Sequence, residues 1–205
     1  MNDEAIHHLT RTDKTLAWVI TRVGPCRLKP KRRSPYEALL QAVVYQQLNG
    51  TAAATILGRV KALFPRRRLP KPADLLATND DRLRAAGLSR AKTAALKDIA
   101  AKTVDGIVPT SRAIARMSEA EIIERLTAVR GVGPWTVDML LIFTLGRPDV
   151  LPATDYGVRQ GFARTYGLKE LPLPKDILAY GERWRPHRST AAWYLWRALE
   201  LPNGS

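Results

Sequence analysis

The stretch LTAVRGVGPWTVDMLLIFTLGRPDVLPATD, residues 126–155, decides the fold, and the rest of the chain supports its two ends. Gly131 and Gly133 stand between an apolar helical run that ends near Val129 and a second run that begins at Pro134. Because glycine adopts positive φ without a Cβ clash, a Gly-x-Gly turn lets the backbone come close to a ligand. A proline at the first helical position needs no partner for its missing N–H, so it marks the start of the second helix. The pattern predicts two helices joined by a turn whose outward-facing amides form an anion site suited to a phosphate.

Two carboxylates in this stretch have different surroundings. Asp155 follows a loop containing Pro148 and Pro152 and precedes the helical run YGVRQGFARTYGL. A carboxylate there is expected to cap a helix and, if its face lines a pocket, to stay ionised and stabilise positive charge. Asp138 lies inside an apolar helix. We expect it to be structural and hydrogen-bonded to backbone amides or an arginine, because buried carboxylates are usually paired.

The charge of the chain favours a polyanionic partner. Lysine and arginine number 33 against 19 aspartates and glutamates, which gives a net charge of +14 and a pI near 10.4. Nucleic acid is the first candidate, although a basic protein can also use its charge for solubility or for an acidic partner. With 205 residues, 45% of them hydrophobic, the chain can bury the core of one or two small domains.

Cysteine count and hydropathy exclude several classes of protein. Cys26 is the single cysteine, so neither a disulfide framework nor a cysteine-ligated metal site can form within one chain. The first residues do not read as a signal peptide, and no run is apolar for the length that a bilayer requires. We expect a cytoplasmic protein with no membrane contact and no redox or organic cofactor. The adjacent pair His7 and His8 is expected to be solvated.

Helical signals recur along the chain, and strand signals do not. Ser34 precedes Pro35 in the pattern of a helix cap, and the long run after it breaks near Asn49-Gly50. Ser118 and Glu121 have the capping-box spacing. The run Arg66–Arg68 lies between prolines and is expected to be a basic loop that is either solvated or in contact with DNA. The sequence predicts an all-α protein.

Three features together resemble one known family. They are the hairpin GVGPWT, the separation 155 − 135 = 20 between Trp135 and Asp155, and the later WRPHRSTAAWYLW. Their combination is similar to the 3-methyladenine DNA glycosylase II (AlkA) family of the helix-hairpin-helix DNA glycosylase superfamily. The likeness runs from about Ser34 to Trp196. It does not include the N-terminal β domain that longer members of the family carry.

The resemblance implies an all-α fold of two helical lobes, with a cleft between them and the hairpin at its rim. Residues 1–33 are expected to pack with the C-terminal lobe. Residues 34–145 would form a central lobe that ends in the helix-hairpin-helix, about 118–145. Residues 146–205 would carry the catalytic aspartate.

The resemblance also implies roles for individual residues. Asp155 would be catalytic, a pure capping role being the alternative. Trp135 stands where relatives such as endonuclease III carry a lysine nucleophile, and tryptophan cannot form a Schiff base, so we expect hydrolysis without strand cleavage. Residues expected at the base pocket are Trp135, Met139, Tyr156 and Trp196. Met139 replaces an aromatic residue of the best-known relatives, so the pocket is expected to be less aromatic and its substrate range to differ.

DNA contacts and a cation site follow from the same resemblance. Residues expected at the DNA are Gln47, Leu48, Arg130, Gly131, Gly133, Thr136 and Arg159. Leu48 is the candidate wedge that fills the gap left by an extruded base, or else an ordinary core residue. A sodium or potassium ion would be held by the backbone carbonyls of Thr127, Arg130 and Val132, bridging to a phosphate.

The predicted function is excision of alkylated purines, such as 3-methyladenine and 7-methylguanine, from double-stranded DNA by a monomeric protein. Two alternatives stay open. One is a glycosylase of the same fold for another lesion, such as hypoxanthine, ethenoadenine or a deaminated base. The other is a non-catalytic DNA-binding module, which would have no need of Asp155 at that spacing.

Overall fold

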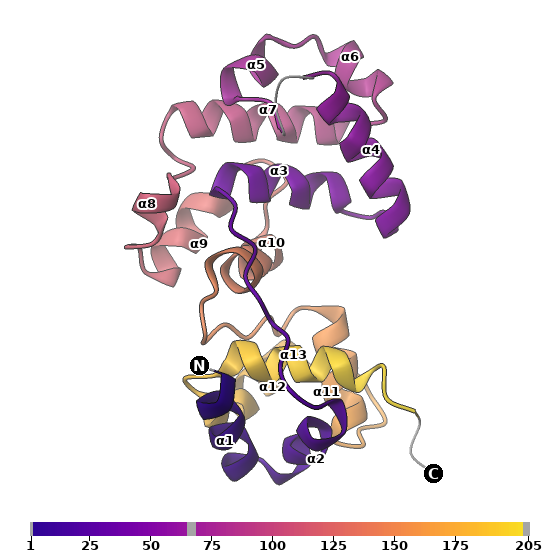
Figure 1. The fold of residues 1–205 in the computed structure, drawn as a ribbon, viewed down its shortest axis with the longest axis vertical. Helices are drawn as coiled ribbons and strands as arrows, with labels where there is room; N and C mark the ends of the chain where they lie inside the picture. The colour runs from indigo at the N-terminus through magenta and orange to yellow at the C-terminus, as the bar shows by residue number, and fades with distance from the viewer. Residues whose placement is uncertain (1, 65–68, 203–205) are drawn as a thin grey trace. The chain divides into compact units, whose positions relative to one another are not determined.

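The computed structural model describes residues 2–64 and 69–202, and throughout those ranges the regular structure is helical, with no β-strand (Figure 1). The prediction of an all-α protein is therefore confirmed. The basic loop expected at Arg66–Arg68 lies outside the described residues. In the same ranges, no helix is long and apolar enough to cross a membrane.

Contacts between Cα atoms divide the chain into two compact units. The middle unit comprises residues 32–140, and the terminal unit joins residues 1–31 with 141–205. Helices of the middle unit are α3 (Pro35–Tyr45), α4 (Gly50–Ala62), α5 (Pro72–Ala77), α6 (Asp80–Ala85), α7 (Arg90–Val104), α8 (Ser111–Ile114), α9 (Glu119–Thr127) and α10 (Pro134–Leu140). Helices of the terminal unit are α1 (Asn2–Thr12), α2 (Lys14–Val23), the π-helix η1 (Leu141–Leu145), α11 (Tyr156–Thr165), α12 (Pro174–Gly181), the 3₁₀ helix η2 (Glu182–Trp184) and α13 (Arg188–Ala198).

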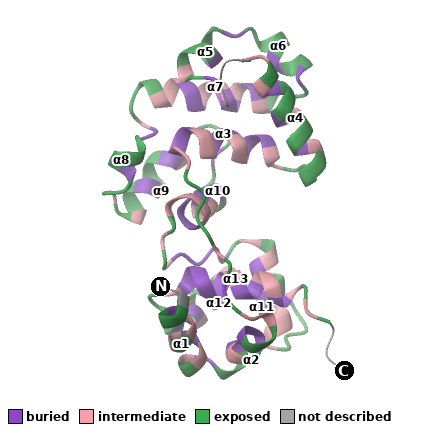
Figure 2. Ribbon diagram, viewed as in Figure 1, coloured by how far each residue is buried: buried purple, intermediate pink, exposed green. Residues whose placement is uncertain are grey.

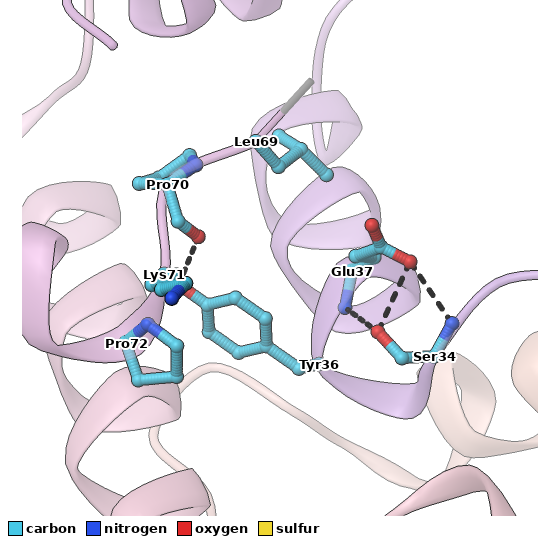
Figure 3. A pocket seen from close by; sticks show the side chains of 7 residues that line it. All are labelled: Ser34, Tyr36, Glu37, Leu69, Pro70, Lys71 and Pro72. Carbon is cyan, nitrogen blue, oxygen red and sulfur yellow. Dashed lines mark hydrogen bonds between the residues drawn. The ribbon is translucent and has the colours of Figure 1, made fainter. Parts of the chain in front are cut away.

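The long helix α7 packs against α3 and α5 in the middle unit. At the start of α3, the Ser34 amide donates to the Glu37 carboxylate at 3.0 Å, and the Glu37 amide donates back to the Ser34 hydroxyl at 3.3 Å. The Tyr36 hydroxyl donates to the Pro70 carbonyl at 3.1 Å beside a surface pocket, which ties α3 to the segment before α5 (Figure 3).

Side chains close the ends of other helices as their spacing predicts. Asn49 caps α4 by accepting from the Ala52 amide at 2.8 Å. Ser118 and Glu121 form a reciprocal capping box at the start of α9. These caps satisfy amides that have no partner inside a helix, so they fix where α4 and α9 begin.

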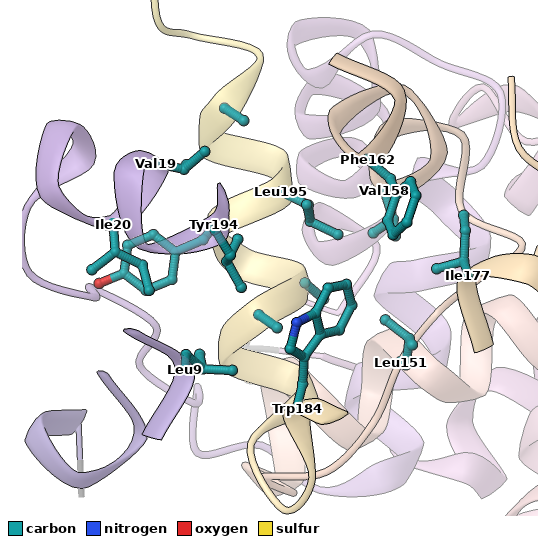
Figure 4. Close-up of a cluster of buried hydrophobic side chains, with 14 of the residues drawn as sticks. Leu9, Val19, Ile20, Leu151, Val158, Phe162, Ile177, Trp184, Tyr194 and Leu195 are labelled. Atoms are coloured by element: carbon teal, nitrogen blue, oxygen red, sulfur yellow. The ribbon is translucent and has the colours of Figure 1, made fainter. Parts of the chain in front are cut away.

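The terminal unit has a core of its own, in which α13 packs against α2 and α11 (Figure 4). Trp184 and Tyr194 are its largest fully buried side chains. The buried carboxylate of Asp13 accepts from the Tyr166 hydroxyl at 2.6 Å and from the Trp184 indole at 2.9 Å. These bonds pair buried polar groups and tie the N-terminal helices to the C-terminal segment.

Helical structure changes character after the hairpin. The sequence predicts one helix from Pro134 onward, but α10 gives way at Leu141 to a π-helical turn that ends at Leu145. The division between the two units falls at the same place. A π-helical turn widens the backbone and often occurs at functional sites.

Candidate active site and DNA-contact residues

The hairpin between α9 and α10 presents two exposed glycine amides. Gly131 has φ 76, a conformation that glycine adopts without strain, and the Val132 amide donates back to Val129 at 3.0 Å. Within the described ranges, the amides of Gly131 and Gly133 donate to no protein acceptor. Exposed amides that lack a partner at the start of a helix are suited to an anion such as a backbone phosphate.

The carboxylate of Asp98, on α7, holds the hairpin by a hydrogen bond to its backbone. Asp98 accepts from the Arg130 amide at 2.7 Å and from the Lys102 ammonium at 2.7 Å. Burial opposes ionisation of Asp98, but the hydrogen bonds from Lys102 and Arg130 outweigh it and hold its pKa below 3.8. Lys102 also donates to the Ala128 carbonyl at 2.7 Å. The sequence did not single out Asp98 because it lies 32 residues before Arg130.

Residues 46–49, the glutamine corner, join α3 to α4 in the same unit. Leu48 is 39% exposed, which contradicts the alternative that it is an ordinary core residue. Gln47 is also exposed and has φ 57, an uncommon conformation outside glycine. In Figure 2 the start of α4 and the connection before it carry the colour of exposed residues.

Thr136 corrects one expectation. Its side chain is only 3% exposed, its amide donates to Gly133, and its hydroxyl lies 3.4 Å from the Gln46 side-chain nitrogen. The Gln46 nitrogen also donates to the Gly131 carbonyl at 2.9 Å. Thr136 therefore supports the hairpin from inside, and its side chain is not placed to contact DNA.

The carbonyls expected to hold a cation differ from their neighbours. Ala128 and Gly131 carbonyls accept from Lys102 and Gln46. In the described part of the chain, no hydrogen bond reaches the carbonyls of Thr127, Arg130 or Val132. Among all the residues that the structure describes, no group of three or more His, Cys, Asp or Glu side chains could hold a metal. Neutral carbonyl oxygens are suitable ligands for a hard cation, so these residues fit the expected ion.

Asp155 caps α11, as its place before that helix predicts. Its Oδ1 accepts from the Val158 amide at 2.8 Å and from the Trp196 indole N–H at 2.7 Å. The Trp196 ring stacks on Phe143 with a centroid separation of 5.6 Å. A Cβ at position 157 would lie 2.9 Å from the Trp196 ring, so Gly157 leaves the space in which the indole reaches Asp155.

The loop before Asp155 is anchored to the start of α13. The Ser189 hydroxyl donates to the Arg147 carbonyl at 2.7 Å and accepts from the Val150 amide at 2.9 Å. Arg188, which is almost fully buried, donates to the Asp149 carboxylate at 2.8 Å and to its carbonyl at 2.8 Å. Sequence reasoning missed this anchor, because it joins residues 39 or 42 positions apart.

The residues expected at the base pocket lie on three helices. Trp135, 42% exposed, and the half-buried Met139 are on α10. Tyr156 is 63% exposed at the start of α11, where its hydroxyl accepts from Gln160 at 3.0 Å, and Trp196 is half-buried on α13. Their assembly into one pocket stays a prediction.

Two further expectations concern charged side chains. The Asp138 carboxylate accepts no hydrogen bond and joins no ion pair among the described residues, so the prediction that it is paired is wrong. Burial and the charge of Glu119 raise its pKa to about 6. Arg159 donates through Nε to the Pro172 carbonyl at 3.0 Å, which leaves its other nitrogens for the expected phosphate contact.

An all-α fold that carries a Gly-x-Gly hairpin and, 20 residues after Trp135, a helix-capping aspartate defines the class of helix-hairpin-helix DNA glycosylases. A family model described as "HhH-GPD superfamily base excision DNA repair protein" matches residues 40–186. The chain belongs to this superfamily. Its enzyme class is therefore DNA N-glycosylase, a hydrolase of the bond between base and deoxyribose.

Several relatives are similar over nearly the whole chain. DNA-3-methyladenine glycosylase 1 of Schizosaccharomyces pombe is 38% identical over 196 residues, covering 95% of this chain and 86% of the relative. The structure of 3-methyladenine DNA glycosylase from the same organism, in complex with abasic DNA, is similar with a TM-score of 0.88 and 37% identity, covering 98% of this chain and 99% of that one. A DNA-3-methyladenine glycosidase from Bacillus halodurans gives a TM-score of 0.86 at 32% identity, covering 95% and 88%.

Proposed function

We propose that this protein is a monofunctional DNA glycosylase that removes alkylated purines, such as 3-methyladenine and 7-methylguanine, from double-stranded DNA and acts as a monomer. The observation that carries the proposal is the Asp155 carboxylate, held on one oxygen by the Val158 amide and the Trp196 indole. Relatives whose names specify 3-methyladenine support the choice of substrate.

The proposed reaction begins outside the active site. A base inside a duplex cannot be reached, so the nucleotide must rotate outward while a side chain fills the gap. Leu48 is exposed on the glutamine corner and is the proposed wedge. The exposed amides of Gly131 and Gly133 are the proposed phosphate contact.

Selectivity in this proposal has two sources. An alkylated purine is cationic, so the indoles of Trp135 and Trp196 favour it by stacking and cation–π attraction of roughly 0.5–2 kcal/mol per contact. A cationic base also leaves without protonation by a general acid. As the glycosidic bond breaks, an oxocarbenium-like centre develops on the sugar. Asp155 stabilises that charge and orients or deprotonates the attacking water.

Hydrolysis without strand cleavage follows from the side chain at position 135. A lysine there would attack the sugar carbon and form a Schiff base, which leads to strand cleavage. Tryptophan has no nucleophilic amine, so water is the nucleophile and an intact strand with an abasic site is the product.

The test is base release from a methylated duplex, read by chromatography together with gel analysis of the strand. We expect free 3-methyladenine or 7-methylguanine, with strand breaks appearing only after alkali. Release of hypoxanthine or ethenoadenine alone, from duplexes that carry those bases, would favour the glycosylase for another lesion. Strand breaks without alkali would contradict the monofunctional assignment.

A monovalent cation at the hairpin is part of the proposal. The carbonyls of Thr127, Arg130 and Val132 would hold it, and the ion would supply positive charge for a DNA phosphate. We expect duplex binding to weaken several-fold when potassium is replaced by tetramethylammonium at constant ionic strength. Equal binding in the two salts would show that no cation at the hairpin contributes to DNA binding.

A further inference from the structure

The side chain of Gln46, at the end of α3, makes hydrogen bonds to the hairpin. Its side-chain nitrogen donates to the Gly131 carbonyl at 2.9 Å and lies 3.4 Å from the Thr136 hydroxyl. Both partners belong to the hairpin segment, more than 80 residues further along the chain, and all three residues lie in the middle unit. Gln46 is thus a bridge from the glutamine corner to the hairpin.

Lys92 fixes the backbone of the same residue. From the first turn of α7, its ammonium donates to the Gln46 carbonyl at 2.7 Å and to the Val44 carbonyl at 2.8 Å. A cation at these positions satisfies carbonyls that the end of α3 leaves without helical partners and complements the helix dipole. Burial lowers the pKa of Lys92. The Gln46 backbone is therefore held by α7 while its side chain holds the hairpin.

Among the described residues, neither α7 nor the hairpin donates a hydrogen bond to Gln47 or Leu48, and the Leu48 amide donates only to the Tyr45 carbonyl, at 3.4 Å. Gln47 has φ 57, and Leu48 is exposed on the next position. Gly131, whose carbonyl Gln46 binds, also offers its amide for a phosphate. Gln46 therefore links Leu48, the proposed wedge, to the hairpin whose Gly131 and Gly133 amides are the proposed phosphate clamp.

We propose that Gln46 is a positioning residue that couples the hairpin's hold on a DNA phosphate to the presentation of Leu48. This inference rests on the proposed function, because it needs a wedge and a clamp. A displacement of the hairpin by bound phosphate acts on the Gly131 carbonyl and is passed through the Gln46 side chain to the backbone that carries Leu48. Through the hydrogen bond from Gln46 to the Gly131 carbonyl, insertion of Leu48 depends on a hairpin that is bound to a DNA phosphate.

The experiment is a double-mutant cycle of Gln46→Glu and Leu48→Ala, read as the affinity ratio between an abasic-site duplex and the same undamaged duplex. Glutamate matches glutamine in size but presents oxygen to the Gly131 carbonyl, so the bond is lost. Gln46→Ala tests the same bond without added charge. Tyr36→Phe is the matched control, since it also removes one side-chain bond to a carbonyl, at the opposite end of α3.

In the wild-type background we expect Leu48→Ala to lower the ratio about tenfold. In the Gln46→Glu background the same change should lower it by less than about twofold, because an uncoupled wedge contributes little. Gln46→Glu and Gln46→Ala alone should each lower the ratio about threefold to tenfold. Tyr36→Phe should leave it unchanged.

Additive effects of Gln46→Glu and Leu48→Ala would overturn the coupling and leave the proposed function standing. Equal losses of affinity for both duplexes in the Gln46 variants would also overturn the coupling, because Gln46 would then support DNA binding without affecting the wedge. A wild-type protein with no preference for the abasic duplex, or with no loss on Leu48→Ala, would overturn the proposed wedge and the coupling together.

Discussion

Trp196 contacts Asp155 through its indole N–H and stacks on Phe143 through its ring. The substitution Trp196→Phe keeps a stacking ring and removes the donor. A hydrogen bond to a charged acceptor is strong and holds the carboxylate in one orientation. We expect single-turnover release of 3-methyladenine to slow about tenfold, with abasic-duplex affinity changed less than about twofold.

Trp193→Phe provides the control for this prediction. Trp193 lies on the same helix, with the Arg197 guanidinium 5.8 Å from its ring centroid. The change should leave the rate of base release unaltered. An unchanged rate in Trp196→Phe would show that the indole does not position Asp155.

The charged carboxylate of Asp138 lowers the free energy of unfolding at neutral pH. Burial and Glu119 raise its pKa from 3.8 to about 6, so the folded protein binds the proton more tightly than the unfolded chain does. The penalty for the buried charge is fully present above pH 6 and disappears as pH falls below 3.8. We expect Asp138→Asn to stabilise the protein by about 1 kcal/mol at pH 7.5, after discounting for solvent screening, and to have no effect near pH 3.5.

Urea unfolding of both proteins at the two pH values measures the difference. A stabilisation that persists at low pH would exclude the carboxylate charge as its cause. A destabilisation at pH 7.5 would mean that the Asp138 carboxylate has a favourable role in the folded protein.

Residue-scale features were predictable where the partners are close in sequence. Asp155 and the Val158 amide are three positions apart, and the capping pattern predicts that bond. The bond from Trp196 to Asp155 spans 41 positions, and the one from Gln46 to Gly131 spans 85. Such bonds depend on how helices pack, which side-chain spacing along the chain does not specify.

Helix packing in the terminal unit depends on one small residue. A Cβ at Gly161 in α11 would lie 2.0 Å from the Leu195 carbonyl of α13, closer than any real contact. Gly161→Ala must push the two helices apart and disturb the core shown in Figure 4. We expect a loss of about 2–4 kcal/mol in the free energy of unfolding.

Gly58→Ala is the matched substitution, since Gly58 also lies inside a helix, α4, but has nothing within 4 Å of an added Cβ. It should stabilise by about 0.5–1 kcal/mol through helix propensity alone. Thermal or urea unfolding measures both. Similar effects of the two substitutions would contradict the close approach of α11 and α13.

At the scale of elements, the sequence predicted where helices start but not how they end or which segments they contact. Ser34, Asn49 and Ser118 cap helices where their spacing indicates. The π-helical turn at Leu141–Leu145 was not predicted, because apolar residues there fit an α-helix equally well. The anchor of Arg188 on Asp149 was also missed, since a salt bridge has no periodic signature in sequence.

The whole molecule carries a net charge of +14, and this charge should dominate binding to undamaged DNA. Each phosphate that the protein neutralises releases counterions, so affinity must fall as salt rises. We expect the affinity for undamaged duplex to fall at least about tenfold between 50 and 200 mM salt, as two or more phosphate contacts require. Fluorescence anisotropy measures it, and an affinity independent of salt would refute binding through phosphates.

The all-α fold and the family follow from sequence alone, because helix signals recur and the hairpin, Trp135 and Asp155 stand at characteristic spacing. The assembly of a base pocket from Trp135, Met139, Tyr156 and Trp196 remains a prediction. Pocket shape depends on side chains from distant parts of the chain, and it decides which damaged base is accepted.

The most direct test of the account compares the wild type with Asp155→Asn in single-turnover release of 3-methyladenine, with abasic-duplex binding followed in parallel. Asparagine keeps the size of the side chain and an oxygen for the helix cap but lacks the negative charge. We expect the rate to fall at least about a hundredfold, with binding retained within a few-fold. Release at the wild-type rate by Asp155→Asn would contradict the catalytic assignment.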